Sequence, residues 1–244
     1  MYANNETGAI QPIREIEALC RKRGVLFHTD AVQAAGHLAI DVQRDNIDML
    51  SLSAHKFHGP KGIGLLFAKS NIQLTSLIRG GGQERGKRAG TENLPGIIGL
   101  AVALKDAQEN MQQNTAYITG LRDALRNGLD KIDGAGFNGS REHCLPGTVN
   151  YSFQGVNGEA LLSLLSNEGI CCSSGSACSA GSLEPSHVLL ALGLSHETAQ
   201  SALRFSLCEY NTMDEIQTII TKVTEAVNRL RRGKYAVNSC QFNK

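Results

Sequence analysis

Two polar clusters in the first quarter of the sequence combine side chains that can take part in covalent chemistry. One runs from His28 to Gln33 and contains Asp30, and the other runs from Ser53 to Lys56. A lysine amine forms a Schiff base with an aldehyde, and an aspartate pairs with a positively charged ring nitrogen. The same two residue types also form structural ion pairs, so the residue types alone leave both interpretations open.

The neighbours of Lys56 favour the interpretation as a cofactor site. Pyridoxal phosphate is the aldehyde cofactor that suits this combination, because its protonated ring acts as an electron sink. Ser53 and His55 offer a hydroxyl and an imidazole to a phosphate, and Gly59–Gly62 allows a tight turn just past the lysine. Gln33 is placed to reach the phenolic oxygen of such a ring from the other cluster.

Short apolar strands must position both clusters. Hydrophobic spacing predicts one helix and three strands, at Pro12–Arg23, 25–28, Ile47–Ser53 and Gly62–Ala68. Ligands of open α/β sheets bind at the carboxyl ends of strands, so Asp30 and Lys56 are expected to face one crevice. Continuous apolar strands that alternate with helices predict an α/β sheet buried on both faces.

The rest of the chain predicts two helices and then a second, smaller α+β region. The helices are 94–111 and 116–132, and the later elements are Thr148–Phe153, Gly158–Asn167, Ile170–Cys172, Pro185–Leu192 and Leu203–Leu207. A last helix begins at the capping-box pair Thr212 and Glu215 and extends to about Arg231. A polar run at 108–115 suggests a boundary, which divides the chain into domains 1–111 and 112–236 and a loose tail, 237–244.

The composition excludes several classes of protein. The 244 residues include 24 Lys and Arg against 23 Asp and Glu, which indicates neither a nucleic-acid nor a membrane partner. The seven cysteines are odd in number and irregularly spaced, which is typical of free thiols in a reducing compartment. We therefore expect a cytoplasmic protein.

Five motifs follow one another along the chain. They are Asn4–Gly8, His28–Gln33, Ser53–Gly62, Gly80–Asn93 and Ser173–Ser179. Together they resemble the cysteine desulfurases, in the class V aminotransferase group of pyridoxal-phosphate enzymes, and the resemblance runs from Met1 to about Arg232. It implies the latter half of a fold-type I large domain, with a mostly parallel sheet, followed by a smaller C-terminal α+β domain.

The resemblance implies a role for each matching residue in binding pyridoxal 5'-phosphate and substrate. Lys56 would hold the cofactor covalently and then move the α-proton of the substrate. The remaining implied contacts are Asp30 to the ring nitrogen, Gln33 and Asn5 to the ring hydroxyl, Ser53 and His55 to the phosphate, and Thr91 to the phosphate in the neighbouring subunit of a homodimer. Asn5 and Arg204 would bind the substrate carboxylate.

Cys178 distinguishes the implied reaction from transamination. The resemblance implies that its thiolate takes sulfur from L-cysteine as a persulfide, which releases L-alanine. The sulfur then passes to a sulfur-acceptor or iron–sulfur scaffold protein, for cluster assembly or thiolation. A free thiol with a pKa of about 8.5 is only a few per cent ionised at neutral pH, so the site must supply a base or a positive field. No resident metal is expected, although Cys178 could transiently touch an iron–sulfur cluster.

Other cysteines are expected to be structural. Cys171 and Cys172 lie in a predicted apolar strand and are expected in the core. Adjacent cysteines in a strand point to opposite faces, which argues against a zinc site that combines them with Cys178.

Two alternatives to the desulfurase interpretation remain open. Family members carry about another 150 residues before the segment that begins at Met1, a length typical of a single domain. One alternative is therefore a truncated, non-catalytic remnant that docks sulfur acceptors through its small domain. The other is a selenocysteine lyase, against which the sequence Ser-Ser-Gly-Ser-Ala-Cys at Ser173–Cys178 argues.

Overall fold

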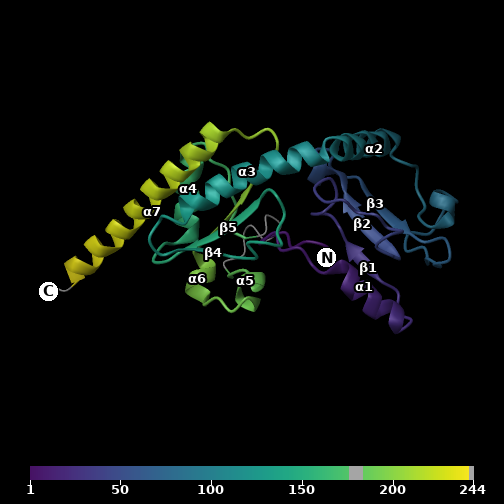
Figure 1. Ribbon diagram of the computed structural model, residues 1–244, viewed down its shortest axis with the longest axis horizontal. Helices are drawn as coiled ribbons and strands as arrows, with labels where there is room; N and C mark the ends of the chain where they lie inside the picture. The colour runs from purple at the N-terminus through teal and green to yellow at the C-terminus, as the bar shows by residue number, and fades with distance from the viewer. Residues whose placement is uncertain (176–183, 242–244) are drawn as a thin grey trace. The chain divides into compact units, whose positions relative to one another are not determined.

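The computed structural model describes residues 1–175 and 184–241 of the chain (Figure 1). The chain divides into two compact units. The first contains Met1–Ala3 and Ile10–Gln112, and the second contains Asn4–Ala9 and Gln113–Lys244. The short stretch Asn4–Ala9 therefore belongs to the same unit as residues more than a hundred positions later. The sequence pattern does not indicate this assignment.

The sheet of the first unit has three strands in the order β1-β2-β3. β1 (His28–Asp30) runs parallel to β2 (Met49–Ser53), whereas β3 (Gly64–Ala68) runs antiparallel to β2. The expected α/β class is confirmed, but the expected parallel direction holds for only one of the two strand pairs described here. The connection from β2 to β3 is residues 54–63, which is shorter than the crossover of about a dozen or more residues that a parallel pair needs.

β1 is displaced from the predicted strand 25–28 because the side chain of Asp48 takes the place of a ladder partner. Its Oδ2 accepts a hydrogen bond of 2.9 Å from the backbone N–H of Phe27. The carbonyl of Phe27 accepts from the N–H groups of Asp48 and Met49. The regular ladder therefore begins at His28, opposite Met49.

Two helices accompany this sheet. α1 (Ile13–Lys22) and α2 (Leu94–Glu109) contribute Ile13 and Leu100 to a core that contains Leu50 and Leu52 of β2. α2 begins where Asn93 accepts a hydrogen bond from the N–H of Gly96. Two short 3₁₀ helices complete the first unit, η1 (Ala54–Phe57) and η2 (Glu84–Gly86).

The second unit is built on an antiparallel sheet in the order β4-β5-β6. Its strands are β4 (Ala135–Phe137), β5 (Thr148–Phe153) and β6 (Ala202–Ser206). All six residues of β5 are buried. Three helices lie beside this sheet (Figure 1), and they are α3 (Met111–Leu129), α4 (Gly158–Asn167) and α7 (Met213–Gln241). All three supply apolar side chains to its core.

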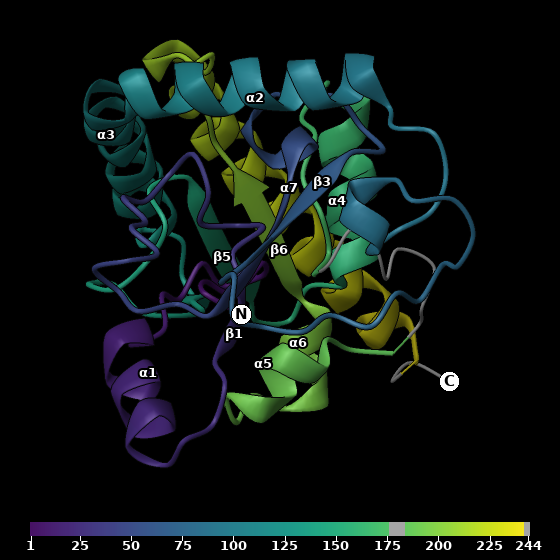
Figure 2. The same ribbon diagram turned by 90° about the vertical axis from the view of Figure 1, so that its right-hand side faces the viewer.

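Two short helices lie side by side in the second unit (Figure 2), α5 (His187–Ala191) and α6 (His196–Gln200). They form a small core of their own around Leu189 and Ala199. The predicted capping box of α7 is confirmed, because Thr212 Oγ1 accepts from the N–H of Glu215, and Glu215 Oε2 accepts from the N–H of Thr212.

Three expectations are wrong in detail. The predicted strand Ile170–Cys172 does not form, because backbone pairing with β6 is limited to one bridge between Ser173 and Arg204. Cys171 is consequently exposed and Cys172 half-buried, so the core placement fails for Cys171. Residues 237–241, expected in a loose tail, continue α7 because no proline stops the helix once it has formed.

Among the described residues, none of the helices combines the length and the apolar character needed to cross a bilayer.

Candidate functional site

Polar side chains share one face of the first sheet near the carboxyl ends of its two parallel strands. Asp30 ends β1 and is exposed, and it pairs with Ser51 of β2 in the ladder. Ser53 ends β2 two residues later, so it lies on the same face as Ser51. Neighbouring strands are about 4.8 Å apart, which places the ends of β1 and β2 within reach of one small molecule.

Lys56 follows this edge directly, because β2 continues into η1 without an intervening loop. His55 and Lys56 lie in the last turn of this 3₁₀ helix. It is closed by a hydrogen bond of 2.9 Å from the N–H of Gly59 to the carbonyl of Ala54. A Cβ at Gly59 would lie 2.9 Å from that carbonyl oxygen, so the turn requires glycine there.

The backbone of Lys56 is held from a second direction. The ring Nε2 of His37 lies 3.3 Å from the carbonyl oxygen of Lys56, which accepts the hydrogen bond. The side chain of Lys56 is half-buried, while His55 beside it is exposed.

Asp30 is oriented by the turn that follows β1. Its Oδ1 accepts a hydrogen bond of 2.9 Å from the N–H of Val32. The turn is anchored by the buried residues Ala31, Ala34 and Ala35, and Gln33 lies half-buried between them. One carboxylate oxygen therefore fixes the side chain, and the other is available to a ligand.

This set of groups fits pyridoxal phosphate. The cofactor presents an aldehyde, a ring nitrogen, a ring hydroxyl and a phosphate, and the first unit offers an amine, a carboxylate, an amide, a hydroxyl and an imidazole. These come from Lys56, Asp30, Gln33, Ser53 and His55. Asp30 and Ser53 end the two adjacent parallel strands, and the other three follow a strand end within three residues.

Thr91 lies elsewhere in the first unit. It is exposed in the loop between η2 and α2. Hydrogen bonds connect that loop to the segment before η2, because Gln83 Oε1 accepts from the N–H of Gly90 and the carbonyl of Ile78 accepts from the N–H of Ala89. Its predicted contact is with the cofactor phosphate of the neighbouring subunit, and that contact stays a prediction.

Arg204 and Asn5, the predicted substrate-binding pair, meet in the second unit. Arg204 lies in β6 between Leu203 and Phe205, which are both buried on the opposite face. Its Nη1 donates a hydrogen bond of 2.8 Å to the backbone carbonyl of Asn5. This bond fixes the guanidinium at one corner, and a guanidinium can form two parallel hydrogen bonds to a carboxylate.

The stretch that contains Asn5 is held firmly in the second unit. Asn4 Oδ1 accepts hydrogen bonds of 2.9 Å from the N–H groups of Glu6 and Thr7. Asn150 of β5 donates from Nδ2 to the carbonyl of Glu6, and Ala9 pairs with Cys144 in an isolated bridge. The carbonyl of Asn5 is therefore a rigid anchor for Arg204.

Cys178, the predicted nucleophile, falls in 176–183, outside the described residues. Its role stays a prediction.

Sequence reasoning also missed a contact in the first unit, where His28 Nε2 and Ser51 Oγ lie 2.8 Å apart. The sequence contained a signal that could have indicated this contact. Residues two apart on a strand share a face, and His28 is two residues before Asp30 in β1.

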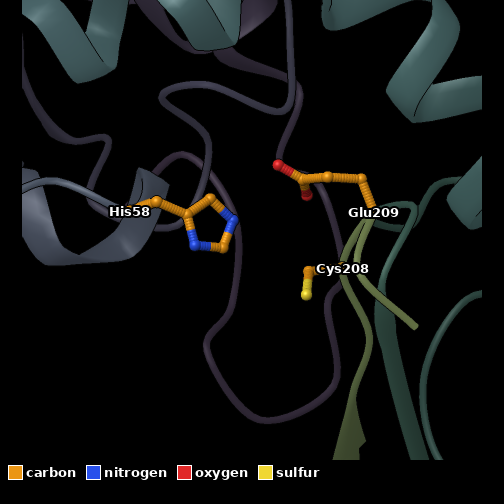
Figure 3. Close-up of side chains that lie close together, drawn as sticks. All are labelled: His58, Cys208 and Glu209. Atoms are coloured by element: carbon orange, nitrogen blue, oxygen red, sulfur yellow. The ribbon is translucent and has the colours of Figure 1, made fainter.

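One cluster of metal-ligand types carries no assignment. Figure 3 shows His58, Cys208 and Glu209. His58 follows η1 in the first unit, whereas Cys208 and Glu209 follow β6 in the second. We therefore assign no shared site to these three side chains.

Comparison with known proteins identifies the family. The model of the aminotransferase class-V family matches residues 1–219. The chain therefore belongs to the class-V aminotransferase family. It is 49% identical over 234 residues to a cysteine desulfurase IscS from Clostridium botulinum strain Hall, and 47% identical over 231 residues to one from Methanosarcina thermophila.

These alignments include 95% of this chain but 59% and 57% of the two relatives. The chain thus spans about three fifths of the length of the curated relatives it matches. Among solved structures, a NifS-like protein superposes with a TM-score of 0.86 at 39% identity, over 94% of this chain and 60% of that one. A NifS-like protein from Rickettsia africae gives 0.85 at 33% identity, over 93% and 60%. The expected fold class is confirmed by both.

Proposed function

We propose that this chain forms part of a pyridoxal-phosphate-dependent cysteine desulfurase, which converts L-cysteine to L-alanine and holds the sulfur as a persulfide on Cys178. The observation that carries the proposal is the placement of Asp30 and Lys56 after two adjacent parallel strands of the first sheet. The relatives named cysteine desulfurase support the choice of reaction within the class-V family.

Bound pyridoxal phosphate supplies an electron sink for the bonds around the substrate's Cα. The Lys56 amine holds the cofactor covalently and then removes or returns a proton at that carbon. Asp30, already fixed through Val32, keeps a positive charge on the ring nitrogen. Gln33 binds the ring hydroxyl, and Ser53 and His55 bind the phosphate.

Arg204 binds the carboxylate of L-cysteine, while the carbonyl of Asn5 restrains its guanidinium and the Asn5 side chain lies close to the same carboxylate. Cys178 Sγ attacks the sulfur of the substrate. A new S–S bond forms, the Cβ–S bond breaks, and the three-carbon product leaves as alanine after protonation. A persulfide is a good sulfur donor because a thiolate of an acceptor protein can attack its terminal sulfur.

The partners of the proposed enzyme are a second copy of the chain and a sulfur-acceptor or iron–sulfur scaffold protein. Exposed apolar side chains on α2 support the homodimer. Leu94, Ile98 and Val102 are 62%, 63% and 63% exposed. Residues four apart lie on one face of a helix, so the three form a stripe that a second copy can cover. Thr91, three residues before the first residue of α2, would reach the cofactor phosphate of that copy. A cytoplasmic location is part of the proposal.

The test combines cofactor binding with turnover. The purified chain is titrated with pyridoxal phosphate, and its visible absorbance is compared with that of Lys56→Ala and of Lys61→Ala, an exposed lysine in the turn after η1. We expect Lys56→Ala alone to lose the protein-bound band. An unchanged band in Lys56→Ala would contradict the assignment.

A second pair of variants tests the nucleophile. Cys178→Ser should keep cofactor binding but lose release of alanine and of reducible sulfur from L-cysteine, whereas Cys20→Ser in α1 should retain both. Full turnover by Cys178→Ser would exclude the persulfide role. Turnover of selenocysteine but not of cysteine would instead identify a selenocysteine lyase.

A further inference from the structure

Glu6 is a buried carboxylate that no step of the proposed reaction uses. The residue is only 3% exposed. Ser186 Oγ donates a short hydrogen bond of 2.5 Å to Glu6 Oε2. The backbone of Glu6 is fixed on both sides, since its N–H donates to Asn4 Oδ1 and its carbonyl accepts from Asn150 Nδ2. The carboxylate thus projects from a rigid stretch toward Ser186.

Ser186 connects the Glu6 carboxylate to the first turn of a helix. Its Oγ also accepts hydrogen bonds of 3.2 and 3.3 Å from the N–H groups of Val188 and Leu189, which makes it the N-cap of α5. A hydroxyl has one proton to donate and two lone pairs to accept with. All of its capacity is therefore used, and the proton goes to Glu6.

The Glu6 oxygen that accepts from Ser186 also lies close to Gly175. A Cβ built on Gly175 would have Glu6 Oε2 as its nearest neighbour, at 3.4 Å. Two residues earlier, Ser173 exchanges two backbone hydrogen bonds with Arg204, of 3.0 and 2.7 Å. Arg204 in turn donates to the carbonyl of Asn5, next to Glu6.

Glu6 therefore lies where three stretches of the second unit meet. One contains Asn5, one leads to Gly175, and one resumes the described chain before Ser186. The last two stretches are the immediate neighbours in sequence of 176–183, which contains Cys178. Arg204 contacts two of the three stretches, through its backbone bonds with Ser173 and through its bond to the carbonyl of Asn5.

We propose that Glu6 is a positioning residue that, through Ser186, fixes both stretches flanking Cys178 relative to Arg204. The role of Cys178 in this inference rests on the proposed function. The contact between Glu6 and Ser186 does not, so the two proposals can fail separately.

Four variants of the full chain separate the contact from the helix cap. Glu6→Ala removes the acceptor, and Glu6→Gln retains an amide oxygen that Ser186 can donate to. Ser186→Asp keeps an N-cap, because aspartate caps helices as well as serine does, but it offers Glu6 an acceptor in place of a donor. Ser195→Ala is the matched control, because Ser195 caps α6 in the same way and accepts from the N–H of Thr198.

The first measurement is hydrogen exchange at the amides of Val188 and Leu189, without cofactor. We expect about tenfold faster exchange in Glu6→Ala and in Ser186→Asp, the size of effect that loss of a hydrogen bond to a charged group produces. Glu6→Gln should stay within about threefold of the unmodified chain, since the amide restores the acceptor. Ser195→Ala should leave these amides unchanged.

The second measurement is the rate at which iodoacetamide modifies Cys178, with Cys20 of the first unit as the internal reference. Glu6→Ala and Ser186→Asp should change the rate ratio of Cys178 to Cys20 severalfold, and Glu6→Gln should restore it. Wild-type exchange and an unchanged ratio in Ser186→Asp would overturn the inference. So would an equal change in Ser195→Ala, which would reduce the effect to general loss of helix stability. Neither measurement requires desulfurase activity.

Discussion

Asp30 lies directly opposite Ser51 in the parallel ladder between β1 and β2. The pair shows how a short strand places a charged group. Thr29, its neighbour in β1, is buried on the other face together with Leu50 and Leu52. A strand with one face in the core must direct the alternate residues outward. The burial of Thr29 therefore exposes Asp30 on the face where Ser51 and Ser53 also lie.

Asp30→Asn should weaken binding of pyridoxal phosphate by at least about tenfold, because an amide cannot stabilise a positive ring nitrogen. The substitution preserves the local fold, since the amide oxygen still accepts from the N–H of Val32. A titration followed by visible absorbance measures the affinity. Asp41→Asn is a suitable control, because Asp41 also caps a turn of the first unit, through the N–H groups of Gln43 and Arg44. Equal affinities of the two variants would contradict the assignment of Asp30.

Arg204→Lys should raise the KM for L-cysteine by about tenfold or more and change kcat much less. A lysine retains the positive charge but cannot form two parallel hydrogen bonds to a carboxylate. Steady-state kinetics in the complete enzyme measure both constants. A comparable loss in Arg231→Lys, whose guanidinium contacts the carbonyl of Gln154, would point to a general effect on the second unit. A fall in kcat with an unchanged KM would place Arg204 in a different role.

The sequence predicts the regular parts of this fold well because they obey local rules. The predicted bounds of β5 and α4 agree with the structure, since the alternation of polar and apolar residue types in β5 and an N-cap at Asn157 are visible in the sequence. α6 was missed because five residues contain too little periodicity to recognise. The strand expected at Ile170–Cys172 fails because apolar character predicts burial but cannot supply a partner strand.

The residues of the candidate site also fall into two groups, those that local sequence pattern predicts and those that depend on contacts far along the chain. Asp30, Ser53 and Lys56 are found at strand ends, as the motifs predict, because short-range pattern determines them. The assignment of Asn4–Ala9 to the second unit depends on contacts with Cys144 and Asn150, far along the chain. No local pattern contains such pairings. Glu6 and its bond with Ser186 could therefore be found only in the structure.

The second unit should lose stability in acid through Asp130. Tyr151 donates a hydrogen bond of 2.6 Å to Asp130, and Arg141 forms two more, of 2.8 and 2.9 Å. The bonds from Arg141 lower the pKa of Asp130, with Tyr151 adding to the effect although partial burial opposes it. A lowered pKa stabilises the folded state above the unfolded value of about 3.9, and this stabilisation is lost as the pH falls through the folded value.

Urea unfolding at pH 6 and at pH 3 tests this dependence. Asp130→Asn should reduce stability at pH 6 and should show a smaller further loss on acidification than the unmodified chain does. Asp133→Asn, which changes an exposed carboxylate three residues later, should leave the pH dependence as it was. Parallel acid curves for Asp130→Asn and the unmodified chain would show that the cluster does not contribute.

Cys171 and Cys172 should differ sharply in reactivity, although they are adjacent. Cys171 is exposed and lines a cavity of about 470 Å³ beside the first turn of α7. Cys172 packs against the core of the second unit, and burial, with a smaller contribution from Cys171, raises its pKa to about 11. At pH 8 the thiol of Cys172 is therefore protonated and unreactive, because the thiolate is the nucleophile.

Alkylation by iodoacetamide at pH 8, read by fragment mass spectrometry, should modify Cys171 at least about tenfold faster than Cys172. The raised pKa also has a consequence for folding. The neutral thiol favours the folded state fully below the unfolded pKa of about 8.5, and this contribution is lost as the pH rises through about 11. Cys172→Ala should therefore flatten the fall in stability between pH 8.5 and 11, whereas Cys171→Ala should retain it. Equal alkylation rates at pH 8, or an unchanged alkaline curve in Cys172→Ala, would contradict the burial of Cys172 as the cause.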